Sequence, residues 1–123
     1  MKKLLFILLL FSSSVYSQNY LDHSYSDIIN RLETKYETGY DKDTKRNYIV
    51  ATDESAMYYY AFNANYICNI YAFSIDGRGY NYYKSLCIAG GFVEVQGKFY
   101  SQEYTTSICL IENRWWCIVT RKS

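Results

Sequence analysis

The chain has few of the residues from which common catalytic centres are built. Its 123 residues include no proline and one histidine, His23, and no phosphate-binding loop, nucleophile elbow or N-glycosylation sequon occurs. Catalysis by a Ser-His or Cys-His pair would have to use His23. This residue falls in a predicted N-terminal tail, whereas a general base must be held firmly at its target. The sequence therefore predicts no catalytic residue.

Partial motifs for a metal ion or a nucleotide also fail. The four cysteines lie 19, 22 and 8 positions apart, without the close pair that is typical of a zinc site. Asp41 to Asp43 begins like a calcium loop, but Arg46 stands where that loop requires a glycine. Gly77 and Gly79 begin like a dinucleotide-binding loop, but Tyr82 occupies the position of the third glycine. No metal and no cofactor are predicted.

The N-terminus carries the strongest targeting signal of the chain. Lys2 and Lys3 precede an unbroken apolar run over 4–11, which is shorter than the roughly 20 residues that span a bilayer. Small residues follow this run, so the sequence predicts a signal peptide over 1–17 and cleavage before Gln18. An uncleaved anchor is the alternative. No cysteine stands at the junction, so no lipid anchor is expected there.

Residues 18–123 are then expected to form a single domain in the periplasm or outside the cell. Loss of Lys2 and Lys3 leaves 11 basic residues against 12 acidic ones, which gives no electrostatic reason to bind nucleic acid or an anionic membrane. No second apolar segment approaches the length of a membrane span, so none is predicted after signal cleavage.

The run Met57–Ile75 is the densest aromatic stretch of this domain. It predicts two strands that turn at Asn63-Ala64-Asn65, because asparagine tolerates the left-handed conformation. A strand is expected over 47–52. A helix is predicted from the cap Ser24 to Gly39, because four apolar residues recur there at helical spacing. These are Ile28, Ile29, Leu32 and Tyr36.

A similar order follows in the second half. A helix is predicted from Tyr80 to the glycines at 90–91, followed by hairpins over 92–102 and 105–120. Ala61–Cys68 matches Leu110–Cys117 at a shift of 49 residues, with the second turn placed at 112–114. The fold class predicted is α+β, a helix plus an antiparallel meander, duplicated as αβββ-αβββ with the helices on one face of the sheet. Chance agreement of two hairpins is the alternative.

This order of elements in a small exported chain resembles the module of the β-lactamase-inhibitor proteins and of outer-membrane-assembly lipoproteins. The resemblance is architectural and covers most of the domain. It implies a sheet face that is presented to another protein. The leader, with Gln18 after its expected cleavage site, also resembles those of small exported proteins of the Bacteroidetes.

The even number of cysteines in an exported domain favours disulfides. A three-residue turn at 112–114 would place Cys109 opposite Cys117, and Cys68 would then pair with Cys87. The alternative is that some of the four stay buried thiols, because cysteine packs well as a small apolar side chain.

Aromatic side chains remain as the means of binding. Consecutive rings alternate between the two faces of a strand, so each sheet face carries some of them. The candidate binding residues are Tyr58, Tyr60, Tyr71, Trp115 and Trp116. We expect a non-enzymatic interaction module that binds an unknown partner protein through these rings. A glycan-binding module that stacks sugars on them is the alternative, and a hydrolase would need His23 or a carboxylate pair held in a cleft.

Overall fold

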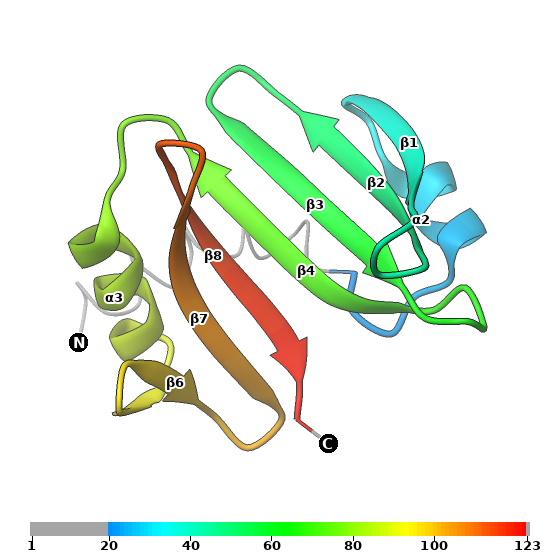
Figure 1. Ribbon diagram of the computed structural model, residues 1–123. Coiled ribbons are helices and arrows are strands. Elements are labelled where there is room, and N and C mark those ends of the chain that lie inside the picture. The colour runs from blue at the N-terminus through cyan, green and yellow to red at the C-terminus, as the bar shows by residue number, and fades with distance from the viewer. Residues whose placement is uncertain (1–19, 123) are drawn as a thin grey trace.

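The computed structural model describes residues 20–122, so the predicted signal peptide over 1–17 lies outside the described residues (Figure 1). Within these residues, two helices and eight strands follow in chain order. They are α2 (Tyr25–Arg31), β1 (Lys35–Asp41), β2 (Arg46–Thr52), β3 (Ala56–Phe62), β4 (Cys68–Ile75), α3 (Tyr80–Ala89), β5 (Val93–Val95), β6 (Lys98–Tyr100), β7 (Tyr104–Ile111) and β8 (Arg114–Arg121).

The predicted fold class is wrong. All eight strands form one antiparallel sheet in the order β1-β2-β3-β4-β8-β7-β6-β5, and the two helices have only 7 and 10 residues. The sheet therefore dominates the fold, and a balanced αβββ-αβββ arrangement of α+β type does not describe it. The difference lies in the segment after α2, which forms an additional strand, β1, and does not continue the helix.

The first helix begins where predicted and ends early. The Ser24 hydroxyl accepts a hydrogen bond from the backbone N–H of Asp27 at 3.2 Å and so caps α2. The helix then ends at Arg31, and β1 pairs with β2 over its whole length. Gly39 does not cap a helix but lies opposite Tyr48 in this ladder. Cross-strand pairing thus prevails over the weak helical periodicity of a short segment.

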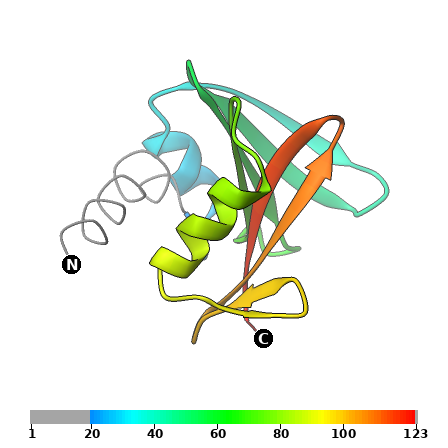
Figure 2. The ribbon, with the colours of Figure 1, turned by 90° about the vertical axis from the view of Figure 1, so that its left-hand side faces the viewer.

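Both helices of residues 20–122 lie on one side of the sheet, and the opposite side, the helix-free face, carries neither of them (Figure 2). Alternate residues of the central strands point toward the helices and form the core, because side chains in a strand alternate between faces. Ile49, Tyr60, Tyr71 and Val119 follow one another across β2, β3, β4 and β8 on that side. Ile28 of α2 and Tyr83 of α3 are fully buried against the same cluster. The residues between these core positions point to the helix-free face.

The turn between β7 and β8 differs from the predicted one in length. Glu112 and Asn113 both have positive φ, at 51° and 64°, and form a two-residue turn, so Ile111 pairs with Arg114. Cys109 therefore lies opposite Trp116, whereas Cys117 lies opposite Ile108 on the other face. The predicted Cys109–Cys117 disulfide is incompatible with this register, because the two side chains point to opposite sides of the sheet.

Candidate binding groove

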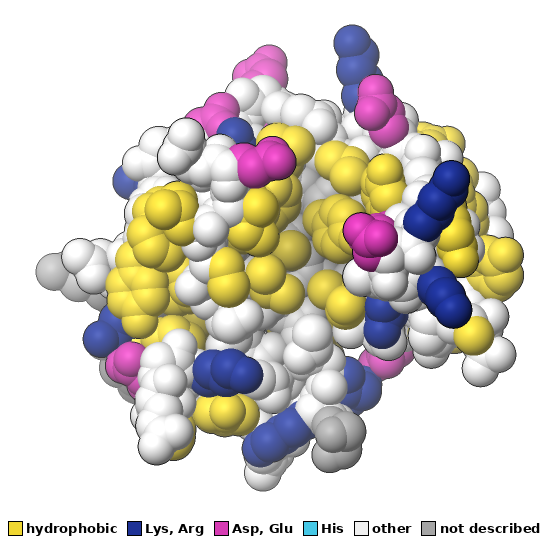
Figure 3. Space-filling model, in the orientation of Figure 1, with side chains coloured by type: hydrophobic (Ala, Val, Ile, Leu, Met, Phe, Trp, Pro, Cys, Tyr) yellow, Lys and Arg dark blue, Asp and Glu magenta, His cyan; other side chains and the backbone are white. Residues whose placement is uncertain are grey.

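The helix-free face of the sheet is hollowed into a groove of about 580 Å³. Figure 3 shows this face, with hydrophobic side chains gathered on both sides of the hollow. The groove is lined by Asp41, Met57, Tyr59, Ile70, Ala72, Ile111, Glu112, Arg114, Trp116 and Ile118. Its volume falls within the range of about 300–1,000 Å³ that is usual for ligand pockets.

The register of the central strands builds the floor of this groove. Tyr59 of β3 lies opposite Ala72 of β4, and Ala72 lies opposite Ile118 of β8. Residues two positions along each strand point to the same face, which brings in Ile70 and Trp116. Apart from Ala72, these floor residues are only partly buried. The groove thus keeps apolar surface in contact with solvent, at a cost of about 25 cal/mol per Å² relative to burial.

Two carboxylates lie at the groove, one from each half of the chain. Asp41 comes from the end of β1 and Glu112 from the turn between β7 and β8. Neither forms a salt bridge with any residue within 20–122. The Asp41 carboxylate accepts a hydrogen bond from the backbone N–H of Asp43 at 2.9 Å, which orients it. Negative charge at the groove favours an occupant that carries a lysine or an arginine.

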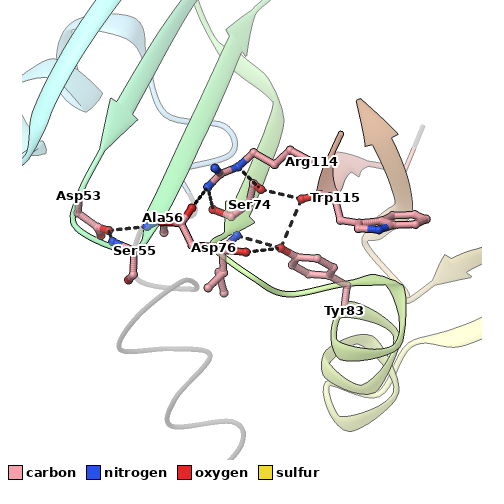
Figure 4. A network of polar contacts seen from close by, with 9 residues as sticks. Asp53, Ser55, Ala56, Ser74, Asp76, Tyr83, Arg114 and Trp115 are labelled. Carbon is pink, nitrogen blue, oxygen red and sulfur yellow. Dashed lines mark hydrogen bonds and ion pairs between the residues drawn. The ribbon is translucent and has the colours of Figure 1, made fainter. Parts of the chain in front are cut away.

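The remaining charged residue of the lining, Arg114, is already engaged. Its guanidinium forms an ion pair of 2.6 Å with Asp76 and donates to the Ser74 hydroxyl, also at 2.6 Å. Ser74 in turn donates to the backbone carbonyl of Trp115 at 2.6 Å. Figure 4 shows these contacts between β4, β8 and the loop that follows β4. Arg114 therefore stabilises the rim of the groove and contributes little free positive charge to it.

Beyond the end of the β4–β8 ladder, a network of polar contacts connects the two strands. The ladder covers Ile70–Phe73 on β4, and the next contacts between the strands run through side chains. The buried hydroxyl of Tyr83 accepts a hydrogen bond from the backbone N–H of Ile75 at 2.9 Å and lies 3.4 Å from the carbonyl oxygen of Trp115. Burial raises the pKa of Tyr83, so this hydroxyl stays neutral and able to donate.

Tyr59, on the groove floor, is held by a neighbouring ring. Tyr48 stacks on Tyr59 with 5.7 Å between ring centroids, and it lies across Gly39 of the edge strand. Burial, followed by the nearby Asp41 carboxylate, raises the pKa of Tyr59, so it lines the groove as a neutral phenol. A side chain at position 39 would occupy the space of the Tyr48 ring, since a Cβ there would approach ring atoms to 3.0 Å or less.

We expect Gly39→Ala to displace the Tyr48 ring and to lower the free energy of unfolding by about 1 kcal/mol, the size of a lost ring stack. Urea unfolding of the two single variants and of Gly39→Ala/Tyr48→Ala measures the effect. In the Tyr48→Ala background the glycine substitution should be almost neutral. An equal loss in both backgrounds would show that the added methyl group acts through the backbone instead.

The structure separates the five predicted binding residues. Tyr58, Tyr60 and Tyr71 are buried in the core on the helix side. Burial raises the pKa of each of them, and they cannot contact a partner at the open face. Trp115 also faces the helices and meets Tyr80 of α3 edge-on at 5.8 Å. Trp116 alone of the five lines the groove.

The five binding residues predicted from the sequence include neither the aliphatic floor residues nor the two carboxylates. Ile70 and Ile118 stand at alternate positions within apolar strands, which was a usable signal for a sheet with two apolar faces. Glu112 and Asp41 had no local signal, because the sheet order alone brings the turns of separate hairpins to one groove. Their shared location could be found only from the topology.

His23 lies outside the groove, beside α2. Its Nδ1 is 2.6 Å from the carboxylate of Asp27, which also binds Arg31, and these two contacts hold the pKa of Asp27 below its usual value. Within residues 20–122 no group of three or more His, Cys, Asp or Glu side chains is placed to hold a metal ion. None of the helices in the described part of the chain combines the length and apolarity needed to cross a membrane.

Comparisons of the chain with protein-family models, with curated proteins and with solved structures found no match.

Proposed function

We propose that this chain is a small exported, non-enzymatic interaction module, whose helix-free sheet face binds an apolar segment of a partner protein. The observation that carries the proposal is the groove itself. It exposes Tyr59, Trp116 and aliphatic side chains on a rigid sheet, beside two carboxylates without a salt bridge within the described chain. Aromatic residues in such settings are the usual anchors of protein interfaces. The partner would be exported as well, since the leader predicts delivery to the periplasm or beyond.

The composition of the lining favours a protein segment over a sugar. A sugar site needs several polar groups that bind hydroxyls around its stacking rings. Here seven of the ten lining residues are aliphatic or aromatic, with Met57, Ile111 and Ile118 among the aliphatic ones. Apolar side chains would fill this floor, and a lysine or arginine of the partner would pair with Asp41 or with Glu112. Ring stacking on Trp116 with hydroxyls bound by the same carboxylates is the glycan-binding alternative, which the test below distinguishes.

The test is a selection from a display library of random 12-residue peptides on the purified chain. We expect enriched peptides to combine apolar residues with lysine or arginine, and to change the fluorescence of Trp116 on binding. Trp116→Ala should weaken their binding by about 30-fold, which corresponds to the 2 kcal/mol of a strong interface anchor. Asp41→Asn/Glu112→Gln should weaken it several-fold and flatten its dependence on salt.

Leu110→Ala is the matched control. Leu110 is 55% exposed on β7 but stands opposite Trp115, on the side of the sheet away from the groove. It should leave peptide binding unchanged, and the melting temperature of every variant should be measured alongside. Peptides that bind Trp116→Ala as well as the wild type would refute the groove as the site. Binding of polysaccharides on a glycan array, with no peptide enriched, would establish the glycan alternative instead.

A further inference from the structure

The four cysteines are thiols in the structure, and two of them lie near each other in the core. Each thiol shifts the pKa of the other: the neighbouring Cys117 on β8 lowers the pKa of Cys87 on α3, and Cys87 raises the pKa of Cys117. Both are buried in the core on the helix side, with exposed fractions of 4% and 1%. The predicted partners of these residues lie elsewhere. Cys109 points to the opposite face of the sheet, and Cys68 donates to the backbone carbonyl of Ile70 at 3.4 Å.

The packing of α3 on the sheet independently explains why the two thiols meet. Tyr83 lies one helical turn before Cys87, and its hydroxyl is 3.4 Å from the carbonyl oxygen of Trp115, two residues before Cys117. Four residues of helix advance about 6 Å and two residues of strand advance about 6.6 Å. Since α3 and β8 run in the same general direction (Figure 1), the step from Tyr83 to Cys87 and the step from Trp115 to Cys117 lead to neighbouring positions.

Phe73 gives a third point of reference. It lies opposite Cys117 in the β4–β8 ladder and contacts the Tyr83 ring edge-on at 5.8 Å. The helix is therefore located on β4 and on β8 by contacts that do not involve sulfur. These contacts bring the segment of α3 that carries Cys87 onto the segment of β8 that carries Cys117.

We propose that Cys87 and Cys117 form a disulfide that attaches α3 to the centre of the sheet, while Cys68 and Cys109 remain thiols. The oxidant is a protein disulfide or a low-molecular-weight disulfide, which an exported chain meets outside the cytoplasm. The inference concerns the helix side of the sheet and does not depend on the groove.

The reaction is a pair of thiol–disulfide exchanges. The thiolate of Cys87, formed by loss of its proton to solvent, attacks one sulfur of the oxidant and releases the other as a thiolate. Cys117 then loses its proton and attacks the Cys87 sulfur of this mixed disulfide, which releases the second half of the oxidant. Two electrons pass from the two cysteines to the oxidant, which ends as two thiols. Both sulfurs are accessible to the oxidant while the chain folds, before α3 covers the sheet.

Peptide mapping tests the pairing directly. The reduced, unfolded protein is refolded in a mixture of reduced and oxidised glutathione, blocked with N-ethylmaleimide under denaturing conditions and digested with trypsin. Each cysteine falls in its own tryptic peptide, over 47–78, 85–98, 99–114 and 115–121. We expect 85–98 linked to 115–121, with the other two peptides alkylated. Alkylation of both 85–98 and 115–121, or their linkage to another cysteine peptide, would overturn the proposal.

Melting temperatures give a second readout. The disulfide would close a loop of 30 residues, so its reduction should lower the melting temperature by about 10 °C or more. Cys109→Ala, the matched control, should keep both the linked peptides and the sensitivity to reduction. Cys87→Ala/Cys117→Ala should lose that sensitivity. If this double variant does not fold, the peptide map of the wild type decides the question alone.

Discussion

Tyr71→Ala is expected to lower the free energy of unfolding by about 3–5 kcal/mol, the range measured for truncation of a buried aromatic ring. Tyr71 is 1% exposed and lies in the middle of β4, where the two halves of the sheet join. Its ring stacks on Tyr60 at 5.5 Å and packs against Phe73 at 5.8 Å. Removal of the ring leaves a cavity between β3, β4 and β8, which the rigid sheet cannot fill by collapse.

Urea unfolding followed by circular dichroism measures this loss. Small domains are stable by only about 5–15 kcal/mol, so the variant should unfold at a much lower urea concentration than the wild type. Tyr40→Ala is the control, because Tyr40 is 54% exposed on the edge strand β1. Its effect should stay within about 0.5 kcal/mol. A loss below about 1 kcal/mol for Tyr71→Ala would contradict the assignment of Tyr71 to the core.

The central strands could be predicted because their local signals agree. In β3 and β4, aromatic and β-branched residues favour strands. The polar turn between them contains Asn63, whose side-chain oxygen accepts hydrogen bonds from the backbone N–H groups of Asn65 and Ile67. Propensity, turn chemistry and tertiary pairing thus indicate the same hairpin, and β3 pairs with β4 as the sequence predicts.

Strand β1 could not be predicted because its signals conflict. Ile28, Ile29, Leu32 and Tyr36 continue a helical period, whereas Tyr36, Thr38 and Tyr40 alternate as in a strand. Lys35–Asp41 is mostly exposed, so little burial distinguishes the two states locally. The seven paired positions with β2 settle the outcome, and the sequence of the segment alone does not contain that information.

The groove could not be predicted from the sequence for a related reason. Whether Trp115 or Trp116 faces the helices depends on register, and neighbouring residues exchange faces when the register slips by one. The two-residue turn places Glu112 at positive φ, which is uncommon for a side chain without the local hydrogen bonding of asparagine or aspartate. A sequence pattern therefore favours a longer turn. The pairing of β8 with β4 overrides this local preference.

Tyr83→Ala is expected to cost about 4–5 kcal/mol, and Tyr83→Phe about 1–3 kcal/mol. The phenylalanine variant keeps the ring against Phe73 but removes the acceptor of the Ile75 backbone N–H. This N–H lies where the β4–β8 ladder has ended, so no strand carbonyl replaces the hydroxyl. An unsatisfied donor in the interior costs the full free energy of its desolvation. The alanine variant adds the loss of the buried ring.

Tyr82→Phe is the matched control on the same helix. The Tyr82 ring is partly exposed beneath the guanidinium of Arg78, at 4.7 Å, and meets the Tyr83 ring edge-on. Loss of its hydroxyl should change the free energy of unfolding by less than about 0.5 kcal/mol. Hydrogen exchange adds a local readout, because the Ile75 amide should lose protection in Tyr83→Phe while core amides of β3 keep theirs. Equal stabilities of the two phenylalanine variants would mean that the Tyr83 hydroxyl does not join β4 to β8, and that ring packing alone holds α3 to the sheet.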